Sequence, residues 1–251
     1  MLERIEVDTH THTVLSGHAW STLRENARAG RERGLKGMCL TEHGYALPGA
    51  GPHYLTAVQK MLPPDLEGLK MFYGVEANIL GLEGQIDIPD QMLFGSAWNI
   101  ASMHPECMDS GTEDENTHSY KLILAHPAVD MLGHIDDIRF PCRFEEVVGE
   151  AGRLGKVIEI NNNSLHNRRG SIPRVEEIVR LCARLGVQVA VSSDAHFDTM
   201  VGAVDSALAL LAKADFPDEL VVNRTLAAFE EYHVGRRERV AAARDGVLKG
   251  A

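Results

Sequence analysis

The residues best suited to chemistry lie near the start of the chain, where His10, His12 and His18 fall within nine positions. In an extended segment, residues two apart point to the same side, so His10 and His12 can face one metal ion. His18 lies further along and can reach a second position. Neutral imidazole binds zinc, iron, copper and nickel, so these histidines could supply part of the ligand set of a metal site. A lone His-x-His is also common by accident, so a partner set is needed.

Further histidines and carboxylates supply that partner set, because they end or follow apolar runs of strand length. The runs are 5–9, 36–41, 70–75, 98–103, 131–133, 157–160 and 187–191. The residues at their carboxyl ends are His10, His12, His43, Glu76, His104, His134, Asp194 and His196. Asp194-x-His196 repeats the spacing of the first pair, and the two oxygens of Glu76 can bridge two cations. One such histidine could be a core imidazole, but a whole set at strand ends indicates a metal centre.

Helical patterns alternate with these runs, at 21–34, 117–125, 144–154, 173–186 and over much of the tail from 201 onward. Strands that alternate with helices predict a parallel α/β sheet. A β/α barrel builds its site from the carboxyl ends of its strands, whereas an open sheet gathers ligands at one switch point. Polar residues at the ends of most strands favour the barrel. The sequence contains no linker or repeat, so we expect one domain over residues 1–251.

Composition narrows the classes of partner. The 251 residues include 25 basic and 36 acidic side chains, for a net charge of −11, which argues against a nucleic-acid or anionic-membrane surface. No apolar run approaches the roughly 18 residues of a membrane span, and the first residues lack the apolar centre of a signal peptide. The scattered cysteines never form Cys-x-x-Cys and suit a reducing cytoplasm, where we expect the protein to act.

Together the motifs resemble the PHP (polymerase and histidinol phosphatase) superfamily, most closely its bacterial YcdX-type phosphatases. The matching segments are 8–12, 41–44, 74–78, 159–162, 165–171 and 193–196, together with His18, His104 and His134. They run through most of the chain in a specific order, although the neighbours of His104 and His134 depart slightly from the family pattern. The resemblance implies a distorted, TIM-like (β/α)7 barrel that holds three divalent metal ions at the carboxyl ends of its strands.

The resemblance also implies which residues hold each ion. The first ion would be held by His10, His12, Glu76 and Asp194. The second would be held by Glu76, His104 and His134, and the third by His18, His43 and His196. Glu76 would bridge the first two ions. Zinc is the expected metal, with manganese or iron as alternatives.

Such a trinuclear site suits the hydrolysis of a phosphate ester, because cations neutralise phosphoryl oxygens and lower the pKa of the attacking water. We expect a hydroxide between the first two ions to attack a small phosphate monoester, with Glu76 and Asp194 as the central carboxylates. Arg168 and Arg169, in the loop after the sixth strand, could hold the phosphate or could form a solvated basic loop. His166 beside them has the same two interpretations. Asp8 is expected to orient a ligand histidine.

Other functions stay open at this point. A phosphodiesterase or nuclease would need a groove with several basic residues, and none is visible. Histidinol phosphate is one candidate substrate, since the superfamily includes that activity. A metal-stabilised module without turnover is a third hypothesis. We expect a small-molecule phosphate ester as the partner, with no nucleic acid or membrane, and the family leaves a homo-oligomer open.

Overall fold

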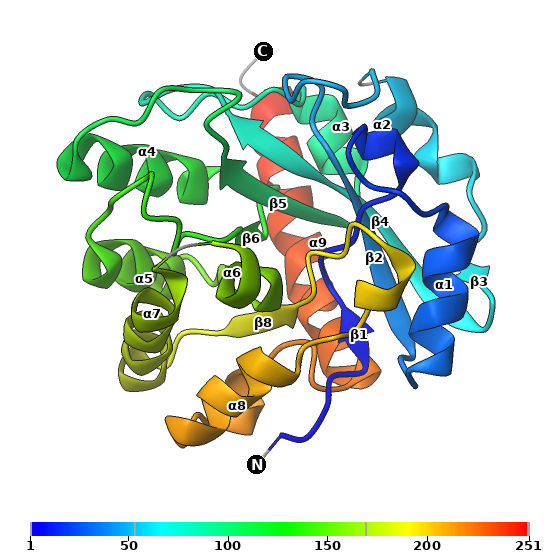
Figure 1. Ribbon diagram of the computed structural model, residues 1–251. Helices are drawn as coiled ribbons and strands as arrows, with labels where there is room; N and C mark the ends of the chain where they lie inside the picture. Colours follow the sequence, from blue (N-terminus) through cyan, green and yellow to red (C-terminus); the bar gives the residue numbers. More distant parts are fainter. Residues whose placement is uncertain (1, 53, 169, 250–251) are drawn as a thin grey trace.

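A parallel sheet curved into a barrel forms the centre of the computed structural model, which describes residues 2–52, 54–168 and 170–249 (Figure 1). The strands are β1 (Val7–Asp8), β2 (Gly37–His43), β3 (Asp65–Leu66), β4 (Leu69–Ile79), β5 (Trp98–Met103), β6 (Met131–Leu132), β7 (Val157–Asn161) and β8 (Val189–Ser192). Parallel pairing follows the order β1-β2-β4-β5-β6-β7-β8, and β3 lies off this path as an antiparallel partner of β4. The carboxyl ends of the seven parallel strands therefore meet at one end of the barrel.

The barrel closes through single contacts between its first and last strands. Beyond the ends of β1 and β8, Thr11 and Ala195 form an isolated parallel bridge. Between the two strands, Asn223 fills the gap: its Nδ2 donates to the carbonyls of Val7 (2.7 Å) and Val191 (2.6 Å), and its Oδ1 accepts the Val191 N–H (3.0 Å). The predicted distorted (β/α)7 barrel is confirmed, and at this seam the contacts of Asn223 take the place of a strand pairing.

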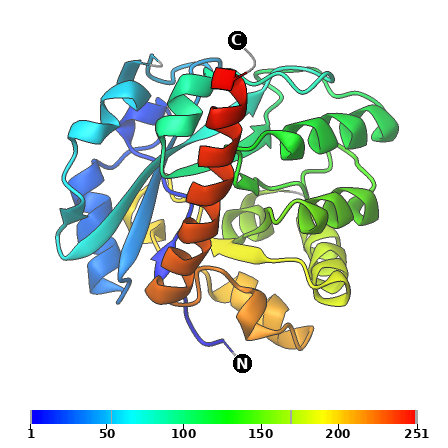
Figure 2. The same ribbon diagram turned by 180° about the vertical axis from the view of Figure 1, so that it is seen from behind.

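Helices surround the barrel on both sides, and α9 crosses behind it (Figure 2). The helices are α1 (Leu23–Glu32), α2 (Tyr54–Val58), α3 (Asp90–Gly95), α4 (Glu113–Ala125), α5 (Phe144–Arg153), α6 (Asn162–Asn167), α7 (Ser171–Leu185), α8 (Asp205–Lys213) and α9 (Leu226–Lys249). Short 3-10 turns are η1 (Val14–Ser16), η2 (Gln59–Met61), η3 (Asp198–Met200) and η4 (Asp218–Leu220). Within the described ranges, no helix is both long and apolar enough to cross a membrane.

One face of each strand changes from apolar to polar toward its carboxyl end. Because alternate residues of a strand share a face, Cys39 lies in line with His43 on β2, and Phe72 lies in line with Glu76 on β4. The apolar residues form one buried cluster, which Phe229 of α9 joins. Its buried members are Val7, Cys39, Phe72, Trp98, Ile100, Met131, Val157, Ala190, Val222 and Phe229. This layer supports the polar layer above it and excludes water from one side.

Several boundaries differ from those that the sequence pattern predicted. β4 continues to Ile79, so Glu76 lies inside a strand instead of following one. The hairpin partner β3 has only two residues, too few to show a period. α4 begins at Glu113 because Thr112 and Glu115 form a capping box upstream of its apolar residues. α7 begins at Ser171, which makes Pro173 its third residue, where a missing N–H still costs no helical hydrogen bond.

Candidate metal centre

Glu76 lies at the centre of the predicted ligands, fully buried on β4. Its carboxylate oxygens lie close to five imidazole nitrogens. The distances are 2.8 Å to His43 Nδ1, 3.2 Å to His10 Nε2, 3.4 Å to His12 Nε2, 3.0 Å to His134 Nε2 and 3.4 Å to His104 Nε2. The first three contacts involve Oε2 and the last two Oε1, so each oxygen faces its own group of rings. This arrangement lets one carboxylate serve two neighbouring positions.

Asp194, just beyond β8, completes the buried part of the site. Its Oδ1 lies 3.4 Å from His12 Nε2, 3.7 Å from His10 Nε2 and 3.6 Å from His196 Nδ1. The backbone of Asp194 has a positive φ of 50°, and that of His134 a φ of 30°. Residues with a Cβ seldom adopt these angles, and they cluster at functional sites. The turns that follow β6 and β8 are therefore shaped to bring these side chains inward.

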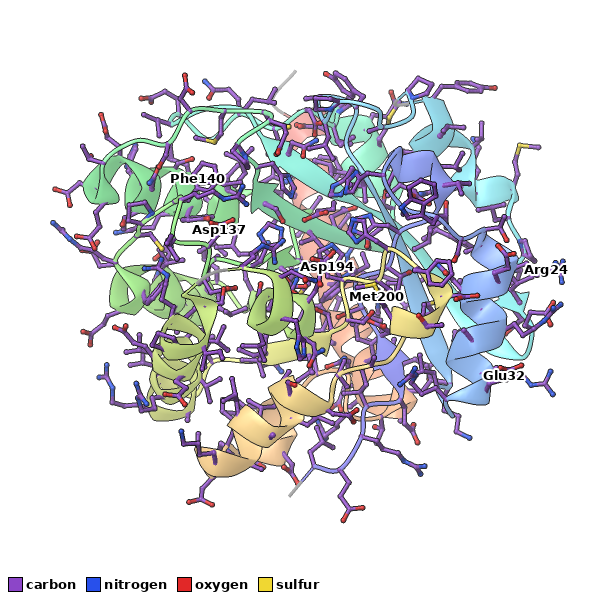
Figure 3. The ribbon with its side chains drawn as sticks, in the orientation of Figure 1. Arg24, Glu32, Asp137, Phe140, Asp194 and Met200 are labelled. Carbon is purple, nitrogen blue, oxygen red and sulfur yellow. The ribbon has the colours of Figure 1, made fainter. Side chains whose placement is uncertain are left out.

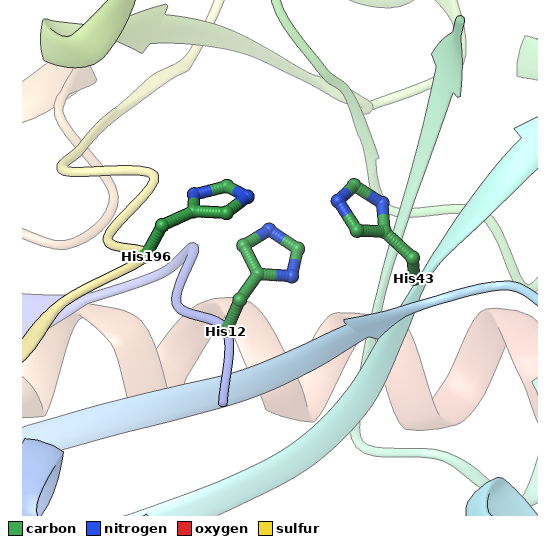
Figure 4. A group of neighbouring side chains, drawn as sticks. All are labelled: His12, His43 and His196. Atoms are coloured by element: carbon green, nitrogen blue, oxygen red, sulfur yellow. The ribbon is translucent and has the colours of Figure 1, made fainter. Parts of the chain in front are cut away.

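His18 and His196 form the outer part of the site, nearer to solvent. Their Nε2 atoms lie 2.8 Å apart, and the ring of His18 lies 4.9 Å from that of His43. Figure 4 shows the rings of His12, His43 and His196 turned toward a common space. The ligand nitrogens of these three residues lie within 4.8 Å of one another. All nine predicted ligands thus lie in one connected cluster.

Several polar atoms of this cluster are buried and have no hydrogen-bond partner among the described residues. They are His10 Nε2, His12 Nε2, both ring nitrogens of His43, and Glu76 Oε2. Even the 2.8 Å approach of His43 Nδ1 to Glu76 lacks hydrogen-bond geometry. Such atoms cost free energy in a dry interior unless another group binds them. Imidazole and carboxylate lone pairs aimed at one space are the donors that a divalent transition metal takes, so the residues fit a metal centre.

The opposite side of several rings is held by a hydrogen-bond partner. His10 Nδ1 lies 2.6 Å from Glu159 Oε1, and His104 Nδ1 lies 2.7 Å from Asn78 Oδ1. These oxygens accept the Nδ1–H, which leaves the lone pair on Nε2 facing Glu76. Metal-ligating histidines are commonly fixed in tautomer and orientation in this way.

Glu159 is the most connected of these partners. Besides His10, its carboxylate accepts the backbone N–H of His134 (2.6 Å) and the hydroxyl of Ser192 (2.5 Å). No role for Glu159 is predicted from the sequence, although its place in a strand that ends beside other polar residues is an available signal. Asp8 contacts a ligand histidine through the backbone and not through its ring: its carboxylate accepts the backbone N–H groups of His10 and Ser193 and ties β1 to the loop after β8.

Charge in the cluster favours ionised carboxylates and mostly neutral imidazoles. Burial would raise the pKa of Glu76, but neighbouring imidazoles, His10 foremost, hold it well below its usual value. Burial lowers the pKa of His43 to about 4 and, with the nearby rings, lowers that of His12 strongly. Burial opposes protonation of His10 too, yet carboxylates led by Glu159 raise its pKa well above the usual value. The proton on His10 thus supplies positive charge where a metal ion would bind, and binding of the ion would release this proton.

A cavity of about 540 Å³ opens above the cluster, and Arg168 lines it. The guanidinium donates to Ser164 Oγ (2.5 Å) and to Asp194 Oδ2 (3.4 Å), and it lies 3.8 Å from Asp137. Figure 3 labels Asp137 and Asp194, the two carboxylates beside this guanidinium, in the interior of the molecule. Only 19% of the Arg168 side chain is exposed, so Arg168 is not part of a solvated loop. His166 turns instead toward Ser206 (3.1 Å), and Arg169 lies outside the described residues.

Residues 8–166 match the family model of the PHP domain. The chain belongs to the PHP domain family. A probable phosphatase of Caldanaerobacter subterraneus subsp. tengcongensis is 40% identical to it over 245 residues, 96% of each chain. A probable phosphatase of Acetivibrio thermocellus is 38% identical over 234 residues, 93% of this chain and 97% of the other. The predicted family is confirmed along nearly the whole chain.

Solved structures bear out the fold of this PHP protein. The histidinol phosphate phosphatase of Lactococcus lactis subsp. lactis, solved with zinc, L-histidinol and phosphate, superposes with a TM-score of 0.60. The match covers 84% of this chain and 94% of that one at 19% identity. At that identity the likeness concerns the architecture, and the chemistry has to be argued from the residues of this chain.

Proposed function

We propose that this PHP-family phosphatase hydrolyses small phosphate monoesters, using divalent metal ions held by the nine clustered ligands. The observation that carries the proposal is the set of buried, unpartnered nitrogen and oxygen atoms around Glu76. A cluster that served only folding would pair these atoms with one another. Here His43 and Glu76, which carry three of these atoms, line a cavity that also receives the guanidinium of Arg168.

Overlapping groups of ligand atoms support a centre with several ions, although the groups differ from the sets that the family resemblance implies: His43 lies with Glu76 and His104 as well as with His12 and His196. Those atoms lie within 4.8 Å of one another in each of three sets: His10, His12 and Glu76; His43, Glu76 and His104; and His12, His43 and His196. The sets overlap, which supports adjacent positions that share ligands. An imidazole-rich site with few carboxylates favours zinc over magnesium or calcium.

Bound cations would neutralise phosphoryl oxygens and lower the pKa of the attacking water. The chain contributes the rest. Arg168 offers a planar guanidinium, held by Ser164 and Asp194, that can hydrogen-bond a phosphate oxygen. Leu47 and Pro48 line the same cavity and would exclude water from one side of the substrate. A volume of about 540 Å³ suits a small ester.

A nuclease is less well supported by the same cavity. Among the described residues that line it, Arg168 is accompanied by the acidic Glu106 and by no lysine, so the lining offers no basic track for a nucleic-acid backbone. Histidinol phosphate is one of the monoesters that a substrate screen should contain. The cytoplasmic location stays a prediction, and the oligomeric state stays open.

The test is phosphate release by the purified, zinc-loaded protein. We expect turnover of an aryl phosphate monoester that a chelator abolishes and that added zinc restores. The matching diester should be a poor substrate. Turnover of the diester alone would favour the nuclease, and zinc binding without turnover of any monoester in a broad screen would favour a metal-stabilised module.

A further inference from the structure

Ser16 contacts three of the predicted ligand histidines, although no chemistry has been assigned to it so far. Its Oγ lies 3.0 Å from His12 Nδ1 and accepts the backbone N–H of His43 at 3.1 Å. Its backbone carbonyl lies 3.2 Å from His18 Nδ1. Ser16 is fully buried at the end of η1, so these contacts are made without water.

Glu42 determines the direction of the Ser16 hydroxyl. Its buried carboxylate accepts the Ser16 hydroxyl at 2.5 Å, the Thr13 hydroxyl at 2.5 Å and the Thr13 N–H at 3.2 Å. Burial raises the pKa of the Glu42 carboxyl, whereas the hydrogen bonds from Ser16 and Thr13 oppose that rise and favour the ionised form, which can only accept. The single hydroxyl hydrogen of Ser16 therefore goes to Glu42.

The lone pairs of Ser16 then determine the tautomer of His12. One lone pair takes the N–H of His43, which can only donate, and the other faces His12 Nδ1. The Ser16 hydroxyl donates its only hydrogen to Glu42, so it can only accept from His12. Nδ1 must therefore carry the hydrogen of the neutral His12 ring. The Nε2 lone pair consequently faces Glu76 and Asp194, whose nearest oxygens both lie 3.4 Å away.

The turn that carries Ser16 has little freedom to move. Thr13 caps η1 by accepting the N–H of Leu15 at 3.3 Å. Gly17 follows with a left-handed φ of 81°, and a Cβ there would lie 2.0 Å from the carbonyl oxygen of Gly49. Only glycine can hold this conformation so close to another backbone. The position of Ser16 is thus set by the local fold and does not depend on a bound ion.

We propose that Ser16, aligned by Glu42, is a positioning residue that holds His12 in its metal-binding tautomer and spaces it from His18 and His43. Without the hydroxyl, Nδ1 of His12 has no acceptor and the ring can take the other tautomer. That tautomer places a hydrogen on the nitrogen that faces the ions. Loss of an outer partner of this kind typically lowers metal affinity or activity by about 10–100-fold.

The experiment measures zinc retention against a chromogenic chelator, with no substrate present. Ser16→Ala should release zinc at chelator concentrations about 10–100-fold lower than the wild type, and Ser16→Thr should restore part of the retention. Ser119→Ala is the matched control, because Ser119 is also fully buried and its hydroxyl donates to the backbone carbonyl of Gly81 at 3.0 Å instead of contacting a ligand ring. Thermal unfolding of the zinc-free proteins measures any general loss of stability.

A second readout needs no variant of Ser16. NMR spectra of zinc-free protein with isotope-labelled histidine report which ring nitrogen of His12 carries hydrogen when no ion determines the tautomer, and the proposal requires Nδ1. A hydrogen on Nε2 contradicts it, as does equal zinc release by Ser16→Ala and Ser119→Ala. The role of Ser16 rests on the proposed metal centre, but different results would overturn the role and the centre. A wild type that binds no zinc overturns the centre, whereas a Ser16→Ala variant that retains zinc like the wild type overturns only the role of Ser16.

Discussion

The inner and outer halves of the candidate metal centre are built differently. Inner ligands such as Glu76 and His10 are fully buried, and Glu159 holds His10 from behind. The outer pair, His18 and His196, lies at the solvent side, and the Nδ1 of each ring faces a backbone carbonyl nearby in sequence. The inner half therefore depends on contacts across the barrel, whereas the outer half depends on the local shape of two loops.

Because of this difference, we expect the two halves to differ in how tightly they bind their ions. Buried ligands with fixed tautomers are preorganised and should hold their ions tightly. Ligands on exposed loops should exchange their ion more readily, at the side from which a substrate enters. The predictions below test whether the inner half dominates catalysis and metal retention.

The largest effect is expected for Glu76→Gln. An amide cannot bridge cations as a carboxylate can, and it adds a hydrogen-bond donor among five imidazoles. Loss of such charge stabilisation is worth several kcal/mol, so kcat/KM for an aryl phosphate should fall by at least roughly 10³-fold. Phosphate release and metal content measure this, with Glu231→Gln on α9 as the control. Wild-type turnover in Glu76→Gln would contradict the central place of this residue.

Glu159→Gln tests the support of the inner half. The substitution keeps the shape but can leave the Nδ1–H of His10 or the N–H of His134 without a charged acceptor. We expect metal affinity to fall by up to about 100-fold. Competition with a chelator measures it, and excess zinc should restore much of the activity. Unchanged affinity would mean that Glu159 serves folding alone.

Arg168→Ala tests the phosphate site beside the inner half. Loss of charge-assisted hydrogen bonds should lower kcat/KM by roughly 10- to 100-fold, with zinc content maintained. Arg168→Lys should recover little, because an ammonium lacks the planar fork. His166→Ala is the matched control two positions earlier, in the last turn of α6, since His166 turns toward Ser206. Equal losses in both variants would point to a disturbed loop and not to a phosphate contact.

His18→Ala tests the outer half. We expect the loss of about one zinc ion per chain and a decrease in kcat/KM of roughly tenfold, smaller than that of the inner variants because Glu76 and its rings stay in place. Chelator titration of the wild type should show one easily removed fraction, and the variant should lack that fraction. If His18→Ala loses all of its metal, the two halves are one cooperative unit and the comparison fails.

Asn223→Ala separates fold stability from the centre and should change the chemistry least. The substitution removes three side-chain hydrogen bonds at the barrel seam and leaves buried backbone groups unpaired. The free energy of unfolding should fall by about 2–3 kcal/mol, while kcat/KM below the melting temperature stays near the wild-type value. Denaturant unfolding measures it, with the exposed Asn167→Ala as the control. A large loss of activity at full folding would show that the seam shapes the site.

The sequence by itself was enough to predict the barrel and the types of ligand, because both are local properties. Alternation of apolar runs with helical patterns predicts a parallel sheet, and His-x-His or Asp-x-His at a strand end places two donors on one side. Boundaries were predicted less well. The capping box before α4 lies upstream of any apolar residue, and β3 is too short to show a pattern.

Only the tertiary structure decided which residues hydrogen-bond to the predicted ligands and fix their orientation. Glu159 reaches His10 across 149 positions of the chain, and Ser16 meets Glu42 across 26. Such pairs depend on the strand register and the closure of the barrel, and no period in the sequence reports either. The same holds for Arg168, which faces the cavity while His166, two positions earlier, faces Ser206. Residue type and spacing determine which donors are available, and packing determines which atom of each donor faces the ion.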